Sequence, residues 1–95
     1  MSLLAGPYEF HHVTYDGPSD VIYAALEAPR PSARQEKTAE ADFLRFDDRG
    51  EFFGVVLVDP RARLDRDGAV YLILPTGDRV RVQGVETLVR RGEPA

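Results

Sequence analysis

Two adjacent histidines are the side chains best suited to metal or acid–base chemistry in this chain of 95 residues. His11 and His12 stand in a β-favouring run, and neighbours in a strand point to opposite faces, so the pair does not easily chelate one ion. A metal would need one imidazole plus carboxylates from the following turn, which makes His12, Asp16 and Asp20 the candidates. The plainer interpretation packs one histidine in the sheet and leaves the other in water, so we predict no metal and no cofactor. A small-molecule or metal site in this region, with Tyr15 included, remains the alternative.

The other patterns with known chemistry are incomplete. Residues Asp65–Gly68 repeat a fragment of a calcium-binding loop, but the first ligand and the closing glutamate are missing in register, so we expect a solvated turn. Asp47 and Asp48 are interpreted in the same way, as solvated residues of a hairpin loop. No serine lies in a nucleophile motif, no glycine-rich nucleotide loop is present, and there is no cysteine for thiolate catalysis or zinc binding. These absences predict a protein that is not an enzyme.

The charge pattern argues against a nucleic-acid protein. The net charge is −4, and every basic residue except Lys37 is an arginine, a bias that fits a GC-rich bacterial genome. Four arginines near the C-terminus could form a basic patch, but no aromatic residues alternate with them as in single-strand binding surfaces. Nucleic-acid contact is therefore the weaker alternative. The four are Arg79, Arg81, Arg90 and Arg91.

Short β-favouring runs separated by turn residues indicate an antiparallel β protein. Gly50 is expected to adopt a left-handed conformation in a hairpin loop at 47–50, and Gly54 predicts a bulge or the close approach of an aromatic ring. Residues 61–68 are expected to form a charged connection in which Leu64 is the only apolar anchor. Residues 35–41 also suit a helix, and we favour a strand there because residues 42–46 continue the alternation. The predicted strands cover residues 10–15, 21–26, 35–46, 52–58, 69–74 and 79–82.

The C-terminal segment at 85–91 is ambiguous. Val85, Leu88 and Val89 are spaced as on a helix, whereas Thr87 shares a strand face with the two valines. We favour a strand and keep a short C-terminal helix as the alternative.

The length predicts a single domain over residues 1–95, with an ordered core at about 8–91. The strand pattern predicts an all-β fold, an antiparallel meander that curls into a two-layer sandwich or a partial barrel. No apolar run is long enough to span a membrane, and the N-terminus lacks the basic region of a signal peptide, so we expect a cytoplasmic protein.

Three predicted strands are apolar on both faces. One sheet of a small domain has too few other elements to cover two such faces everywhere, and large exposed apolar patches are unusual on monomers. A second sheet or a second copy of the chain would cover them, so we predict self-association, most simply a homodimer, with a protein partner as a further option. The segments are Val21–Leu26, Phe52–Val58 and Ala69–Leu74.

A series of short motifs resembles a known family. Residues 15–23 run tyrosine, aspartate, a short turn, then aspartate, an aliphatic pair and tyrosine. In this order over residues 12–64, the motifs resemble the bacterial proteins called domain of unknown function 2283. The later pieces are an acidic segment at Glu36–Ala41, a strand at Phe43–Asp47, a turn at Asp48–Gly50, a glycine-led aliphatic strand at Gly54–Asp59, and Leu64.

The resemblance implies a β fold and adds no catalytic residue, because the family has no established activity. Its members are short bacterial proteins, some of them encoded beside candidate toxins, which implies an interaction role. The chain departs from the pattern in its long loop at 29–31, in Phe53, and in the extension at 69–95. We therefore expect a non-enzymatic interaction and self-association module.

Overall fold

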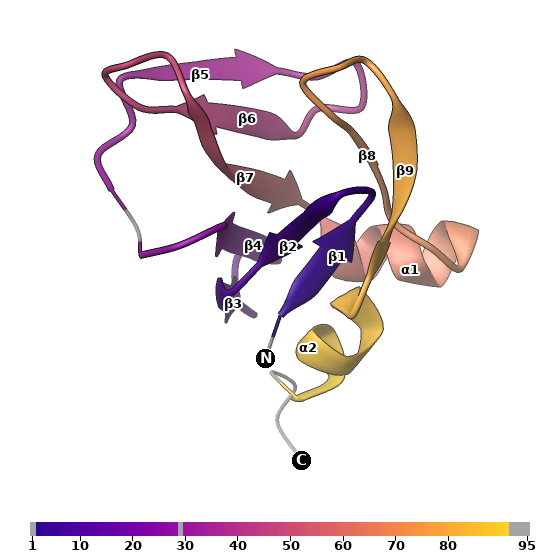
Figure 1. Ribbon diagram of the computed structural model, residues 1–95. Helices are drawn as coiled ribbons and strands as arrows, with labels where there is room; N and C mark the ends of the chain where they lie inside the picture. Colours follow the sequence, from indigo (N-terminus) through magenta and orange to yellow (C-terminus); the bar gives the residue numbers. More distant parts are fainter. Residues whose placement is uncertain (1, 29, 92–95) are drawn as a thin grey trace.

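The computed structural model describes residues 2–28 and 30–91, with the backbone alone at Arg91. Within this part of the chain, nine strands form two antiparallel sheets, and two short helices pack against each other (Figure 1). The prediction of a two-layer antiparallel β fold is confirmed. The strands are β1 (Leu3–Ala5), β2 (Tyr8–Phe10), β3 (His12–Asp16), β4 (Val21–Ala25), β5 (Arg34–Lys37), β6 (Phe43–Phe46), β7 (Phe52–Val58), β8 (Tyr71–Ile73) and β9 (Arg79–Gln83), and the helices are α1 (Pro60–Asp67) and α2 (Val85–Arg91).

The larger sheet has five strands in the order β3-β4-β7-β6-β5. The hairpin β3-β4 and the meander β5-β6-β7 join where β4 pairs with β7, with Val21 opposite Val58 and Ala25 opposite Gly54. The most hydrophobic strand, β7, therefore lies in the middle of the sheet. The predicted hairpin loop before it is confirmed, since Gly50 has a φ of 79°.

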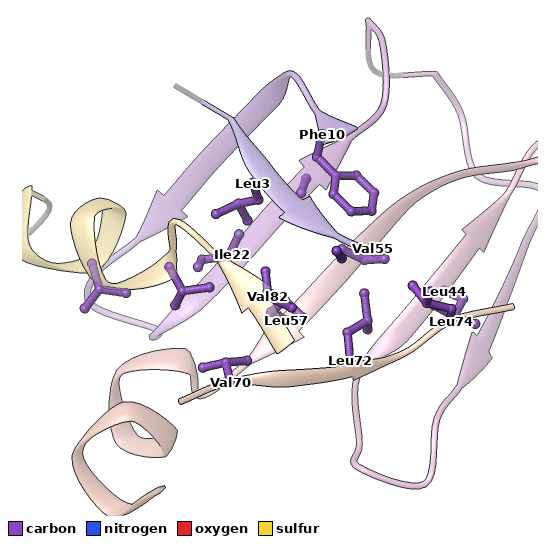
Figure 2. Packing of buried hydrophobic residues seen from close by; sticks show 14 of the residues in the cluster. Leu3, Phe10, Ile22, Leu44, Val55, Leu57, Val70, Leu72, Leu74 and Val82 are labelled. Carbon is purple, nitrogen blue, oxygen red and sulfur yellow. The ribbon is translucent and has the colours of Figure 1, made fainter. Parts of the chain in front are cut away.

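The smaller sheet has four strands in the order β2-β1-β9-β8 and packs its apolar side on the larger sheet. Leu3, Phe10 and Leu72 from this sheet meet Ile22 and Leu57 from the other in one continuous core (Figure 2). At one end of this core four aromatic rings pack mostly edge to face, with ring centroids 5.0 to 6.4 Å apart, a geometry that aromatic pairs favour. They belong to Tyr8, Phe10, Phe46 and Phe52.

Strand β1 lies ahead of the core that was predicted to begin near residue 8. Leu3 and Ala5 are fully buried, and the strand pairs with β2 on one side and with β9 on the other. A strand of three residues followed by Gly6 and Pro7 is too short to display alternation, so its sequence gives no strand signal.

The prediction of a single strand over residues 10–15 is wrong. The chain leaves the smaller sheet after Phe10 and enters the larger sheet at His12, so the alternation of faces restarts at His11. Phe10 is therefore only 1% exposed and points into the core, while His12, which strict alternation places on the same face, is exposed.

Helix α1 occupies the segment predicted to be a charged loop. Pro60 begins the helix, where its missing N–H needs no partner. The carboxylate of Asp20 accepts hydrogen bonds from the backbone N–H groups of Arg61 and Ala62, at 3.0 and 3.1 Å. Because this N-terminal cap comes from the turn between β3 and β4, no local pattern around Pro60 could reveal it.

Helix α2 replaces the strand favoured for residues 85–91. Val85 and Val89 are each 2% exposed and lie one helical turn apart, so both reach the core from the same face. Gly84 turns the chain away from β9 with a φ of 98°, and a Cβ there would lie 2.9 Å from the carbonyl oxygen of Ser2. The alternative of a short C-terminal helix is therefore confirmed.

A buried ion pair joins α1 to the two sheets. Nη1 of Arg63 lies 2.7 Å from Oδ1 of Asp42, and the same guanidinium donates to the carbonyl oxygens of Val58 and Tyr71. Asp42 is fully buried and Arg63 is 8% exposed. Burial raises the pKa of the Asp42 carboxyl, while hydrogen bonds from Arg63 and the Val58 N–H act in the opposite direction.

We expect Asp42→Ala to destabilise the fold by about 3–5 kcal/mol, because it leaves the Arg63 charge buried without a counter-charge. Urea denaturation followed by circular dichroism measures the difference. Asp67→Ala is the control, since Asp67 is an exposed carboxylate paired with Arg66, and it should change the unfolding free energy little. Equal effects of the two substitutions would contradict this account.

Candidate functional site

The outer faces of the two sheets differ in chemistry. On the larger sheet, the residues that alternate with the core residues of β4, β6 and β7 are almost all apolar. Tyr23 is 46% exposed at the middle of this face, opposite Val56. The described strands form only two sheets, and the smaller sheet packs on the opposite side of the larger one (Figure 1). We call this surface the apolar outer face; its members are Val21, Tyr23, Ala25, Phe43, Gly54, Val56 and Val58.

The outer face of the smaller sheet is largely polar. Glu9 on β2 and Gln83 on β9 flank Leu4, whose side chain is 40% exposed. On β8 and β9, Arg79 stacks over the Tyr71 ring with its guanidinium carbon 4.1 Å from the ring centroid. Exposure to water is therefore less unfavourable for this face than for the apolar outer face of the larger sheet.

A hollow of about 360 Å³ opens at one end of the apolar outer face. It lies where Gly54 stands between Ala25 and Arg45 in cross-strand register, so that no side chain fills the middle of the row. A Cβ on Gly54 would lie 2.6 Å from the carbonyl oxygen of Ala24. The predicted bulge is present beside this glycine, in the pairing of β6 with β7, whereas the group that approaches Gly54 is backbone and not the predicted aromatic ring.

The walls of the hollow come from four strands. Arg45 on β6 and Phe53 on β7 form one side, and Tyr23 on β4 forms another. His12 and Thr14 on β3 line it as well, both of them exposed. A bulge in the β6–β7 pairing, next to Arg45, breaks the alternation and turns Phe53 outward, where it lines the hollow.

Two guanidinium groups contact the Phe53 ring, and only one of them has a counter-charge. The guanidinium carbon of Arg30 lies 5.8 Å from the ring centroid and that of Arg45 lies 5.3 Å away. Nη1 of Arg30 bonds to Oδ2 of Asp47 at 2.9 Å. Arg45 has no carboxylate partner among the described residues, and its buried Nε has no hydrogen-bond acceptor there. The hollow therefore carries an uncompensated positive charge beside an apolar wall.

The structure does not bring the predicted metal candidates together. His12 and Asp16 lie at opposite ends of β3, about 13 Å apart at the rise of an extended strand. The Asp20 carboxylate accepts from the Tyr15 hydroxyl at 2.9 Å and caps α1. Within residues 2–28 and 30–91, no cluster of three or more histidine and carboxylate side chains could hold a metal ion. Of the predicted site, only His11 and His12 line the hollow.

The remaining candidates fall into separate structural roles. Residues Asp65–Gly68 are the end of α1 rather than a solvated turn. Arg79 and Arg90 each pair with a glutamate, at 2.6 and 2.9 Å, and lie on β9 and α2 respectively. Arg81 is exposed on β9, and the side chain of Arg91 lies outside the described part of the chain.

Sequence reasoning missed Arg45 as a site residue. The sequence did contain an indication, because Arg45 is a charged residue in an otherwise apolar strand, two positions from Phe43 and therefore on the same face. Phe53 faces outward because of the bulge in the pairing of β6 with β7. The sequence of either strand alone does not indicate that bulge.

Comparison of the chain with protein-family models, with curated proteins and with solved structures gave no match. The resemblance to domain of unknown function 2283 stays a prediction. Among the residues that the structure describes, no helix has the length and apolar character needed to cross a membrane.

Asp47, predicted to be solvated, is instead a buried anchor of the loop beside the hollow. Its Oδ1 accepts from the N–H groups of Glu51 and Arg49, at 3.0 and 2.9 Å, and its Oδ2 binds Arg30. The Glu51 N–H, the Arg49 N–H and Arg30 lower the pKa of the Asp47 carboxyl, and burial opposes them. A lowered pKa in the folded state means that the ionised carboxylate stabilises the fold above about pH 4, and that this contribution is lost as pH falls through the folded-state pKa.

We therefore expect Asp47→Asn to lower the melting temperature at pH 7 and to have a much smaller effect near pH 2. Thermal unfolding at both pH values measures this difference. Asp48→Asn, at an exposed position of the same loop, is the matched control and should leave both melting temperatures unchanged. A loss at Asp47→Asn that is equal at the two pH values would show that its ionisation is not involved.

Proposed function

We propose that this protein is a non-enzymatic interaction module of the bacterial cytoplasm that binds a second copy of itself through the apolar outer face. The observation that carries the proposal is an uncovered, apolar sheet face centred on Tyr23, which is 46% exposed. The arginine-rich composition and the resemblance to short bacterial proteins support the proposed origin.

The edges of the larger sheet are less suitable for self-association than its face. Strand β5 is an edge, every residue of it is exposed, and it carries Arg34, Glu36 and Lys37. Charged edge strands of this kind discourage pairing with another chain. The face, by contrast, gains free energy when another apolar surface removes it from water.

Charges at the rim of the face complement each other across a two-fold axis. Asp16 lies on β3 at one edge of the sheet, and Lys37 lies on β5 at the opposite edge. A two-fold axis along the central strand β7 would set β3 of each protomer over β5 of its partner. Asp16 and Lys37 then differ by two residues along the strands, a gap that a lysine side chain spans. This self-complementarity favours a second copy as the occupant.

The size of the face sets the expected strength. The larger sheet has five strands about 4.8 Å apart and about five residues long on average, which gives about 400 Å² in projection. The three apolar strands contribute about 240 Å² of this area, which is small for a stable interface. We therefore expect a reversible dimer that forms at tens of micromolar protein.

We expect sedimentation velocity to show a species of twice the 10.6 kDa chain mass at tens of micromolar protein. Tyr23→Lys should weaken dimerisation at least about tenfold, because it places a strongly hydrated charge at the centre of the interface. Leu4→Lys is the matched control, since Leu4 is 40% exposed on the outer face of the smaller sheet, and it should leave the dimer intact. Thermal unfolding checks that both variants fold. A strict monomer, or equal weakening by both variants, would contradict the proposal.

A further inference from the structure

We propose that the hollow beside Arg45 is a binding site for a small carboxylate whose remaining part is flat and apolar. This inference does not depend on self-association, because it rests on the cavity and on the unpartnered guanidinium that lines it.

The charge of Arg45 is the first reason. Arg30, which contacts the same aromatic ring, is neutralised by Asp47 at 2.9 Å, whereas Arg45 has neither a carboxylate partner nor an acceptor for Nε within the described residues. A buried donor without an acceptor is unfavourable, and guanidinium groups bind carboxylates through two parallel hydrogen bonds. A carboxylate bound in the hollow would supply the counter-charge and would accept hydrogen bonds from the terminal nitrogens of the guanidinium, which are not among its buried atoms.

The shape of the hollow is the second reason. Its volume of about 360 Å³ falls at the small end of ligand pockets, which suits a single ring or a short branched chain. Ala25 contributes to its floor, and the rings of Phe53 and Tyr23 contribute to its walls. These groups would cover the apolar part of the ligand while Arg45 holds its carboxylate.

The polar side of the hollow favours a carboxylate over other ligand classes. His12 and Thr14 lie on β3, across β4 and β7 from Arg45, and neither side chain forms a hydrogen bond or ion pair with another described residue. His11 is engaged by Glu9, whose carboxylate lies 3.7 Å from Nδ1. Inorganic phosphate can bind the same guanidinium, but it has no apolar part for Phe53 and Tyr23 to cover, so we expect it to bind more weakly. No carboxylate lines the hollow to hold a metal ion.

The test is titration of the whole protein with three probes: benzoate, its neutral isostere benzamide, and inorganic phosphate. Amide chemical shifts in nuclear magnetic resonance spectra report both the affinity and the residues affected. Arg45→Gln removes the charge, and Arg45→Lys keeps the charge but loses the two parallel hydrogen bonds. Arg81→Gln is the matched control, because it removes the same charge from an exposed position on the smaller sheet.

We expect benzoate to shift the amides of residues 12–14, 23–25, 45 and 53, and to bind at least about tenfold more tightly than benzamide or phosphate. Arg45→Gln should abolish this preference for benzoate, Arg45→Lys should retain part of it, and Arg81→Gln should leave it unchanged. Equal binding of benzoate and benzamide, phosphate binding as tight as benzoate, or an unchanged benzoate affinity in Arg45→Gln would each overturn the proposal. Because Tyr23 lines the hollow and also belongs to the apolar outer face, sedimentation with and without benzoate reports the oligomeric state in the same buffer. A monomer in these runs overturns the proposed dimer alone, whereas an unchanged benzoate preference in Arg45→Gln overturns this site alone.

Discussion

Two sheets that share one core leave two faces turned outward, and the described residues supply no third layer to cover either of them. The two faces differ in the residues that they expose to water. On the smaller sheet the outward positions carry Glu9, Arg81 and Gln83, which water solvates. On the larger sheet they carry Tyr23, Phe43 and Val56, which water does not favour.

The helices complete the core rather than cover this face. Helix α2 inserts Val85 and Val89 at one end of the sandwich, and α1 is held by the buried pair of Asp42 and Arg63. Asp20 fixes the start of α1 from a distant turn. Both helices therefore stabilise the contact between the sheets and leave the apolar outer face uncovered.

The strands and turns were largely predictable because their signals are local. Alternation in residues 43–46, the apolar run at 52–58 and the left-handed Gly50 each report on the element that contains them. The predicted strand over residues 35–46 is wrong for a local reason, because a turn in which the Ala41 N–H donates to the Thr38 carbonyl oxygen divides it into β5 and β6. Two other errors arise where the decisive contact is distant in sequence. Asp20 caps α1 from a distant turn, and the Phe10–Tyr15 run is divided between two sheets, so neither contact shows in neighbouring residues. Pro60 was the local signal for the start of α1.

The candidate site was predictable only in part for the same reason. His11 and His12 do line the hollow, but Arg45 and Phe53 join them through pairing across four strands and a bulge. Asp16 and Asp20 flank the same turn, but the Asp20 carboxylate caps a helix and His12 lies at the other end of β3 from Asp16. A site that is assembled by pairing across strands cannot be recognised from the spacing of its residues in the sequence.

The central claim is that the apolar outer face is the surface through which this protein makes contact. Amide nuclear magnetic resonance spectra recorded across a range of protein concentrations test it most directly. The account predicts that signals of Tyr23, Phe43 and Val56 move as the concentration rises, while those of Arg81 and Gln83 stay fixed. Spectra that do not change with concentration, or that change mainly on the smaller sheet, would contradict it.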